Sequence, residues 1–87
     1  MSALVDFDKI NLFVKELELY ISNQNPSFNC SVSYEVDSDG LYLNTEEWYR
    51  GGLQHEASIF ISHNTMIDCT KEYMIDLYEE EEQRCKK

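Results

Sequence analysis

Apolar and polar residues alternate without a break over 28–36, so that successive side chains point to opposite faces of a strand. The segments 41–49 and 53–61 show the same alternation. Turn-forming residues separate the three segments: Asp37-Ser38-Asp39-Gly40 comes first and Arg50-Gly51-Gly52 second. The pattern predicts three antiparallel strands in sequence order, with a tight first hairpin, because its glycine can take a positive φ.

The alternation assigns each strand residue to an inner or an outer face. The expected inner set is Phe28, Cys30, Val32, Tyr34, Val36, Leu41, Leu43, Leu53, His55, Ala57, Ile59 and Ile61. On the outer face, three aromatic residues lie among glutamates: Tyr42, Trp48 and Phe60. Such a composition is unusual for a face that meets only water, and it indicates a contact surface.

Two segments repeat apolar residues at the i, i+3, i+4, i+7 spacing of an amphipathic helix. The first covers 6–21, with an aspartate as its N-cap, and ends before Pro26. The second is expected over 65–83, where Thr65 and Asp68 resemble a capping box. Its predicted apolar face is Met66, Ile67, Tyr73, Met74, Leu77 and Tyr78.

These elements predict one α+β domain over 1–87: helix, three-stranded antiparallel β-meander, helix (αβββα), with both helices packed on one face of the sheet. At 87 residues the chain has room for one core, and its 43% hydrophobic content is enough to build it. The side chains expected near the centre of that core are Leu17, Val32, Ile59 and Leu77.

Three cysteines, an odd number without paired spacing, argue against a disulfide framework and fit a reducing compartment. We expect Cys30 to fill the core and Cys69 to be exposed on the last helix. No run of 18 apolar residues occurs, and residues 1–5 lack the basic start of a secretion signal. We therefore expect a cytoplasmic protein that does not enter membranes.

No motif for catalysis or for metal binding is found. His55 is expected to be a satisfied or edge histidine on the core face, and His63 lacks the paired ligands of a tetrahedral metal site. Glu46 and Glu47 are expected on opposite faces of a strand, which does not favour acid–base chemistry. We expect no enzyme, no metal and no cofactor.

Charge is the strongest compositional feature: 17 acidic residues against seven Lys plus Arg give a formal net charge of −10. Direct binding to nucleic acid is disfavoured, because it requires cations to replace counterions. The charge favours a basic protein partner. The alternative interpretation is that the acidity only keeps the protein soluble.

Carboxylates follow one another at one-turn spacing along the last predicted helix. Helix residues four apart rise about 6 Å, comparable with the spacing of phosphates along one nucleic-acid strand. Such a row can occupy a groove built for nucleic acid. The predicted partner-binding residues are Asp68, Glu72, Asp76, Glu79 and Glu80, with Glu46, Glu47 and Trp48 as a second patch. A solvated acidic helix face is the alternative.

The order helix, three strands, helix resembles the double-stranded RNA-binding fold over nearly the whole chain. That family has a lysine cluster at the start of its last helix, where this chain has Ser62-His63-Asn64-Thr65 and then Asp68, so its RNA-binding residues do not carry over. In size, charge and acid spacing the chain also resembles small acidic phage-type inhibitors, including anti-CRISPR and anti-restriction proteins. That resemblance implies a nucleic-acid mimic that blocks a basic nucleic-acid-binding or nuclease complex.

A competing hypothesis relies on exposed apolar residues. Leu12 and Leu19, a heptad apart, project from the face of the first helix opposite its core stripe. Together with Tyr42, Trp48 and Phe60 they could pair across a two-fold axis. The alternative function is therefore a self-associating structural or scaffold protein, such as a homodimer.

Overall fold

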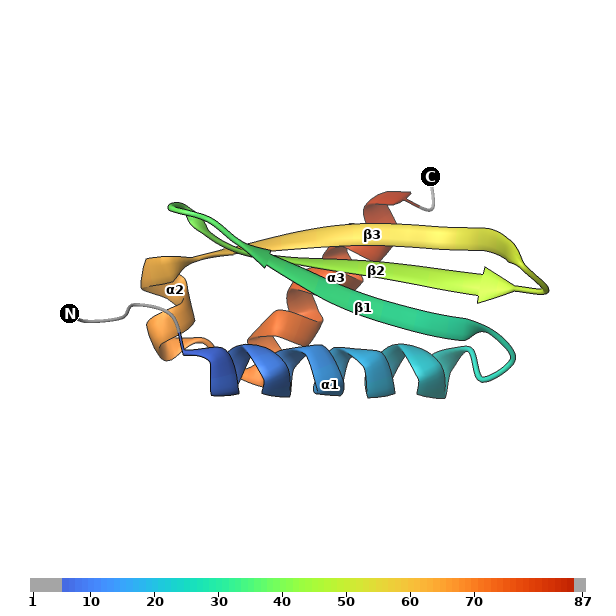
Figure 1. Ribbon diagram of the computed structural model, residues 1–87, viewed down its shortest axis with the longest axis horizontal. Coiled ribbons are helices and arrows are strands. Elements are labelled where there is room, and N and C mark those ends of the chain that lie inside the picture. The colour runs from blue at the N-terminus through green and yellow to red at the C-terminus, as the bar shows by residue number, and fades with distance from the viewer. Residues whose placement is uncertain (1–5, 86–87) are drawn as a thin grey trace.

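The computed structural model describes residues 6–85 and contains a helix, three strands and two further helices (Figure 1). The elements are α1 (Phe7–Gln24), β1 (Asn29–Val36), β2 (Gly40–Tyr49), β3 (Gly52–Ser62), α2 (His63–Asp68) and α3 (Lys71–Cys85). The strands form one antiparallel sheet in the order β1-β2-β3. The predicted α+β class and β-meander are confirmed. Within the described residues, no helix is long and apolar enough to cross a membrane.

A single cluster of buried side chains joins the helices to β2 and β3. Its members are Ile10, Phe13, Leu17, Ile21, Leu41, Leu43, Ile59, Ile61, Met66, Cys69, Met74 and Tyr78. Leu17 and Ile59 are confirmed as core residues, whereas Val32 and Leu77 are only partly buried against the cluster. Helix α1 contacts β1 and α3 contacts β3. The shared core supports packing of the helices on one face of the sheet, which stays a prediction.

Strand β1, which has the clearest alternation, lies at an edge of the sheet, and β2 occupies the centre (Figure 1). Leu41 and Leu43 of β2 are fully buried, while Tyr34 of β1, predicted to face inward, is exposed. An edge strand has a neighbour on one side only, so its inward side chains are less completely covered.

The two hairpin turns form where the sequence predicts them, but for partly different reasons. Asp37 Oδ1 accepts hydrogen bonds from the backbone N–H of Asp39 (2.8 Å) and of Gly40 (3.1 Å), as expected of an aspartate turn. Gly40 does not use the positive φ that a glycine can take in such a turn. In the described chain, positive φ occurs at Arg50 (54°) and Gly51 (82°), in the second turn. The presence of glycine at position 40 is therefore explained by something other than a positive φ.

The explanation is the close backbone approach at Gly40. A Cβ added there would lie 2.4 Å from the carbonyl oxygen of Ile61 and 2.7 Å from the Cα of Ser62. Gly40 and Ser62 are partners in the β2–β3 register. Only a residue without a Cβ lets the two strands meet at this distance.

The single last helix predicted over 65–83 is wrong, because the chain forms two helices with an extended residue, Cys69, between them (φ −70°, ψ 135°). The predicted capping box of Thr65 and Asp68 is also wrong. Ser62 is the N-cap of α2, and its Oγ accepts a hydrogen bond from the backbone N–H of Thr65 at 3.3 Å.

Two side chains, one from α1 and one next to the break, form hydrogen bonds with backbone groups at the end of α2 and the start of α3. Lys9 of α1 donates from Nζ to the carbonyl oxygens of Met66 and Ile67, at the C-terminal end of α2. Thr70 Oγ1 accepts a hydrogen bond from the backbone N–H of Tyr73 at 3.1 Å, as an N-cap does. The break is therefore held by α1 as well as by local capping.

The break changes which side chains face the core. Ile67 and Tyr73, both predicted on the apolar face, are exposed, Ile67 to 63%. Cys69, predicted to be exposed, is buried in the core. All three residues lie at or near the break between α2 and α3, where the two helices take different directions.

An irregularity in the β2–β3 pairing explains why Leu53 does not face inward as predicted. Glu47 pairs with His55, but the next residue, Trp48, pairs with Leu53, so Gln54 has no partner in the register. An extra residue of this kind is a β-bulge and reverses the facing of the side chains beyond it. Leu53, predicted to face inward, is accordingly exposed.

Candidate functional site

The predicted line of partner-binding carboxylates is divided by the helix break. Asp68 ends α2, while Glu72, Asp76 and Glu80 lie on α3, and all four are exposed. The three on α3 are four residues apart, so each is about 6 Å further along the helix axis than the last. We call Glu72, Asp76 and Glu80 the α3 acidic row.

The nearby cations are engaged elsewhere. Lys71 Nζ lies 3.7 Å from a carboxylate oxygen of Glu16 on α1, and Arg84 lies 3.5 Å from Glu81. Within residues 6–85 these are the only ion pairs. The α3 acidic row therefore forms no ion pair within the described chain.

Glu79, also predicted to bind a partner, is engaged within the fold. Its carboxylate accepts a hydrogen bond from the hydroxyl of Tyr20 on α1, and the Tyr20 oxygen accepts one from Gln24 Nε2 at 2.9 Å. Burial, the hydrogen bond and the charge of Glu79 together raise the pKa of Tyr20 to about 12. This contact joins α1 to α3, so Glu79 belongs to the helix interface.

The second predicted patch, on β2, is also divided. Glu46 and Trp48 lie on the outer face, where Trp48 Nε1 donates to Glu46 at 3.3 Å. Glu47 points the other way and is only 2% exposed, which contradicts its predicted place in a surface patch. The expectation that Glu46 and Glu47 lie on opposite faces is confirmed.

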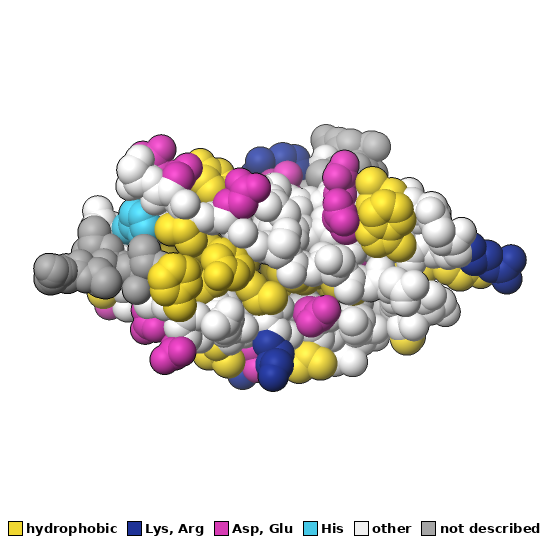
Figure 2. Space-filling model, viewed as in Figure 1, with side chains coloured by type: hydrophobic (Ala, Val, Ile, Leu, Met, Phe, Trp, Pro, Cys, Tyr) yellow, Lys and Arg dark blue, Asp and Glu magenta, His cyan; other side chains and the backbone are white. Residues whose placement is uncertain are grey.

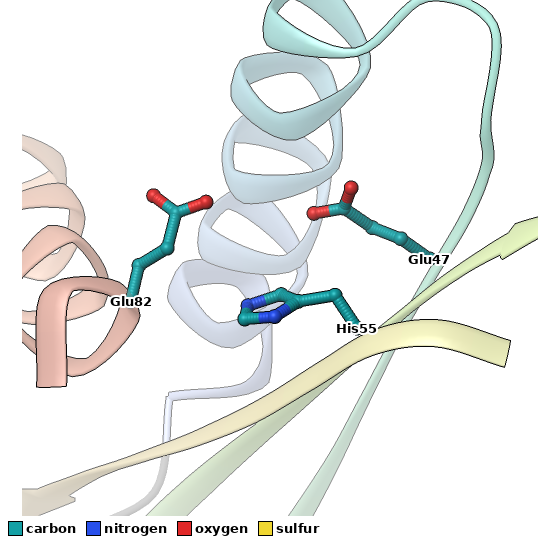
Figure 3. A group of neighbouring side chains, drawn as sticks. All are labelled: Glu47, His55 and Glu82. Carbon is teal, nitrogen blue, oxygen red and sulfur yellow. The ribbon is translucent and has the colours of Figure 1, made fainter. Parts of the chain in front are cut away.

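A polar cluster that the sequence analysis missed lies on the inward side of the sheet (Figure 3). Glu47 of β2, His55 of β3 and Glu82 of α3 point toward one another, and one ligand atom from each lies within 4.8 Å of the others. We call these three residues the Glu47–His55–Glu82 cluster. Glu47 is held from the other side by Asn25 Nδ2 (3.0 Å) and the Tyr78 hydroxyl (3.4 Å).

His55 was expected to be a satisfied or edge histidine: it lies on β3, an edge strand of the sheet, but it is not satisfied. Its Nε2 is buried and has no hydrogen-bond partner in the part of the chain that the structure describes. The strand alternation already placed Glu47 and His55 on the same inward face, but their pairing depends on the β-bulge at Gln54, which the sequence did not indicate. The approach of Glu82 depends on the path of α3, which the sequence did not indicate either.

Two neutral groups near Glu47 are kept protonated by their surroundings. Burial, with the charges of Glu18 and Glu47, raises the pKa of the Cys30 thiol to about 11. Burial, with the charges of Glu82 and Glu47, also raises the pKa of Tyr78. At neutral pH Cys30 is therefore a thiol, and the Tyr78 hydroxyl keeps the proton that it donates to Glu47.

The predicted apolar contact residues are at the surface. Leu12 and Leu19 are 48% and 53% exposed, and Tyr42 and Phe60 stack on the outer face with ring centroids 4.8 Å apart. Figure 2 shows hydrophobic side chains gathered also near the left end of the molecule, with acidic groups around them. Phe7, the first residue of α1, is also exposed.

A hollow of about 250 Å³ lies between α1, α2 and the sheet. It is lined by Asp6, Lys9, Ile10, Val36, Leu41, His63, Met66 and Ile67. Pockets that enclose drug-sized ligands measure about 300–1,000 Å³ and bring a few polar groups together. Lys9, the central polar group here, already donates to the end of α2, so this hollow does not form a candidate site.

A scan against models of known protein families, a search of curated proteins and a search of solved structures found no match to this chain. The function is therefore argued from the geometry of the site.

Proposed function

We propose that this chain is a small acidic protein-binding module of the anti-CRISPR or anti-restriction type, which blocks a basic, nucleic-acid-handling partner by presenting carboxylates in place of phosphates. The α3 acidic row is the observation that carries the proposal. Its three carboxylates, Glu72, Asp76 and Glu80, are exposed at one-turn intervals. Neither of the two ion pairs that α3 forms in the described chain includes any of them.

The formal net charge of −10 supports the same proposal. An acidic surface steers a basic partner and raises the association rate, while carboxylates at phosphate-like spacing give specificity within its groove. Asp68, exposed at the end of α2, and Glu46, beside Trp48, extend the acidic surface beyond the row. Glu47 and Glu79 are not part of the proposed surface.

The test is capture of the partner from the native host with the wild-type chain and with the double variant Asp76→Lys/Glu80→Lys. We expect the wild type to retain a basic nucleic-acid-binding protein, to release it as salt rises, and to lose it to competing duplex DNA or RNA. The double variant should retain far less. Circular dichroism and thermal unfolding should show that it folds as the wild type does.

Glu18→Lys/Glu35→Lys is the matched control, since both residues are exposed and lie outside the row. It makes the same change in net charge, so it should bind nearly as well as the wild type. If both double variants lose the partner equally, net charge rather than the row governs binding. If neither loses it, and binding survives high salt, the mimicry proposal is wrong.

The second candidate function is a self-associating structural or scaffold protein. It is favoured by the exposure of Leu12 and Leu19 on one face of α1 and by the Tyr42–Phe60 stack. Sedimentation at hundreds of micromolar tests it: a dimer that Leu12→Glu/Leu19→Glu dissociates would support it, and a strict monomer would exclude the homodimer.

A further inference from the structure

The Glu47–His55–Glu82 cluster brings two carboxylates and an imidazole from three separate elements to one place (Figure 3). Glu47 and His55 are register partners on adjacent strands, so the rigid sheet fixes two of the three groups. Glu82 reaches them from α3. Such a meeting of ligand types on rigid elements is how proteins hold metal ions.

The contacts of Glu47 leave it able to bind a cation. It is 2% exposed, yet its described partners, Asn25 and Tyr78, are neutral donors, one to each carboxylate oxygen. Each oxygen keeps a further lone pair. A buried carboxylate is normally paired with a cation, and within residues 6–85 none forms an ion pair with Glu47.

His55 supplies an independent observation. Its Nε2 is one of the few kinds of side-chain atom that can bind a transition metal directly, and here it is buried without a hydrogen-bond partner in the described chain. Buried polar atoms in folded proteins are nearly always satisfied, so an unpartnered nitrogen facing two carboxylates points to a missing ligand.

We propose that Glu47, His55 Nε2 and Glu82 bind one divalent first-row transition-metal ion of the Zn²⁺ type. One imidazole and two carboxylates suit Zn²⁺ better than Mg²⁺ or Ca²⁺, which prefer all-oxygen ligands. The two carboxylates neutralise the ion. Three protein ligands leave a coordination position open to water.

The geometry requires only small side-chain movements. Ligand atoms bound to Zn²⁺ at about 2.0–2.2 Å lie roughly 3.3 Å from one another in a tetrahedral site. The three groups now lie within 4.8 Å of one another, and rotation of the side chains can close the difference. The bound ion would fasten the C-terminal half of α3 to β2 and β3, and it is independent of the α3 acidic row.

The test titrates metal-free protein with Zn²⁺, and with Mg²⁺ for comparison, under calorimetry and thermal unfolding. We expect one Zn²⁺ per chain, a raised Tm and no effect of Mg²⁺ at equal concentration. His55→Asn and Glu82→Gln should each weaken Zn²⁺ binding at least about tenfold. His63→Asn, at the other histidine, and Glu35→Gln, at an exposed glutamate of β1, are the matched controls and should bind as the wild type does.

A second measurement needs no variant and so does not depend on the variants folding: nitrogen chemical shifts of His55 and His63 are followed by NMR in the wild type as Zn²⁺ is added. Zn²⁺ should move Nε2 of His55 and leave His63 unchanged. The proposal is overturned if His55 does not respond, if His55→Asn binds Zn²⁺ as tightly as the wild type, or if Mg²⁺ gives the same effect. An unresponsive His55 would instead show an imidazole bound to its carboxylate neighbours without metal.

Discussion

Alanine at Gly40 should destabilise the fold far more than alanine at either glycine of the second turn. The new Cβ would lie 2.4 Å from the carbonyl oxygen of Ile61, whereas ordinary contact begins at 3.4 Å. The two strands would therefore have to separate by about 1 Å. Because the obstructing atoms belong to the backbone, no side-chain rotation relieves the contact.

The cost follows from overpacking and from the hydrogen bonds that the shift lengthens. Overpacking costs about 1–3 kcal/mol, and each weakened hydrogen bond adds about 0.5–1.5 kcal/mol. Two bonds are at risk: Asp37 N–H to the Gly40 carbonyl (3.0 Å) and His63 N–H to the Asp39 carbonyl (3.3 Å). We expect Gly40→Ala to lower the free energy of unfolding by about 2–6 kcal/mol and the Tm by roughly 10 °C or more.

Two matched variants isolate the cause. Gly51 has φ +82° but nothing within 4 Å of an added Cβ, so Gly51→Ala should cost only the backbone strain, about 1 kcal/mol. Gly52 has ordinary contacts at 3.5 and 3.7 Å and no positive φ, so Gly52→Ala should be nearly neutral. Urea unfolding followed by circular dichroism measures all three.

Gly40→Asn separates the two explanations for this glycine. Asparagine tolerates positive φ but carries a Cβ, so it should be at least as harmful as alanine if close approach is the reason. The reasoning is refuted if Gly40→Ala costs no more than Gly52→Ala. A well-tolerated Gly40→Asn would point instead to the positive φ that a glycine can take in this turn.

Two further predictions concern the core and the helix interface. Leu17→Ala, at a fully buried core position, should cost about 2–5 kcal/mol, and Val32→Ala, at the sheet edge, should cost clearly less; equal costs in urea unfolding would contradict the edge position of β1. The raised pKa of Tyr20, about 12, means that its contribution to stability is complete below pH 10, the ordinary tyrosine pKa, and is lost as pH rises toward 12. Tyr20→Phe should remove this part of the alkaline loss and the step of the tyrosinate absorbance titration near pH 12. If the step that disappears lies near pH 10 instead, the contact with Glu79 does not form.

The sheet and the first helix could be predicted because their causes are local. When one face of an element is buried, apolar residues recur every two residues in a strand and every 3.6 residues in a helix. The turn residues between the elements form hydrogen bonds with backbone groups close to them in sequence. Asp6, for example, caps α1 by accepting the Lys9 N–H at 3.2 Å, within one turn. Such interactions need no knowledge of the rest of the fold.

The break between α2 and α3 could be predicted only in part. Helical periodicity continues across it in the sequence, and the contact that closes α2 comes from Lys9, far away in the chain. Thr70 was a usable signal, since a threonine three residues before Tyr73 is a common N-cap arrangement. The polar cluster could also be predicted only in part: alternation places Glu47 and His55 on one face, but the β-bulge that pairs them and the approach of Glu82 appear only in the fold.

The acidic run at the end of α3 shows why a count of charges overstates a binding surface. Successive helix residues differ by about 100°, so four consecutive glutamates face almost every direction around the axis. Here Glu79 bonds a tyrosine of α1, Glu80 is exposed, Glu81 pairs with an arginine, and Glu82 joins the polar cluster. Only Glu80 of the four continues the α3 acidic row. Charge reversal at Glu80 should therefore act on the partner, whereas reversal at Glu79 should act on the helix interface and on the stability of the fold.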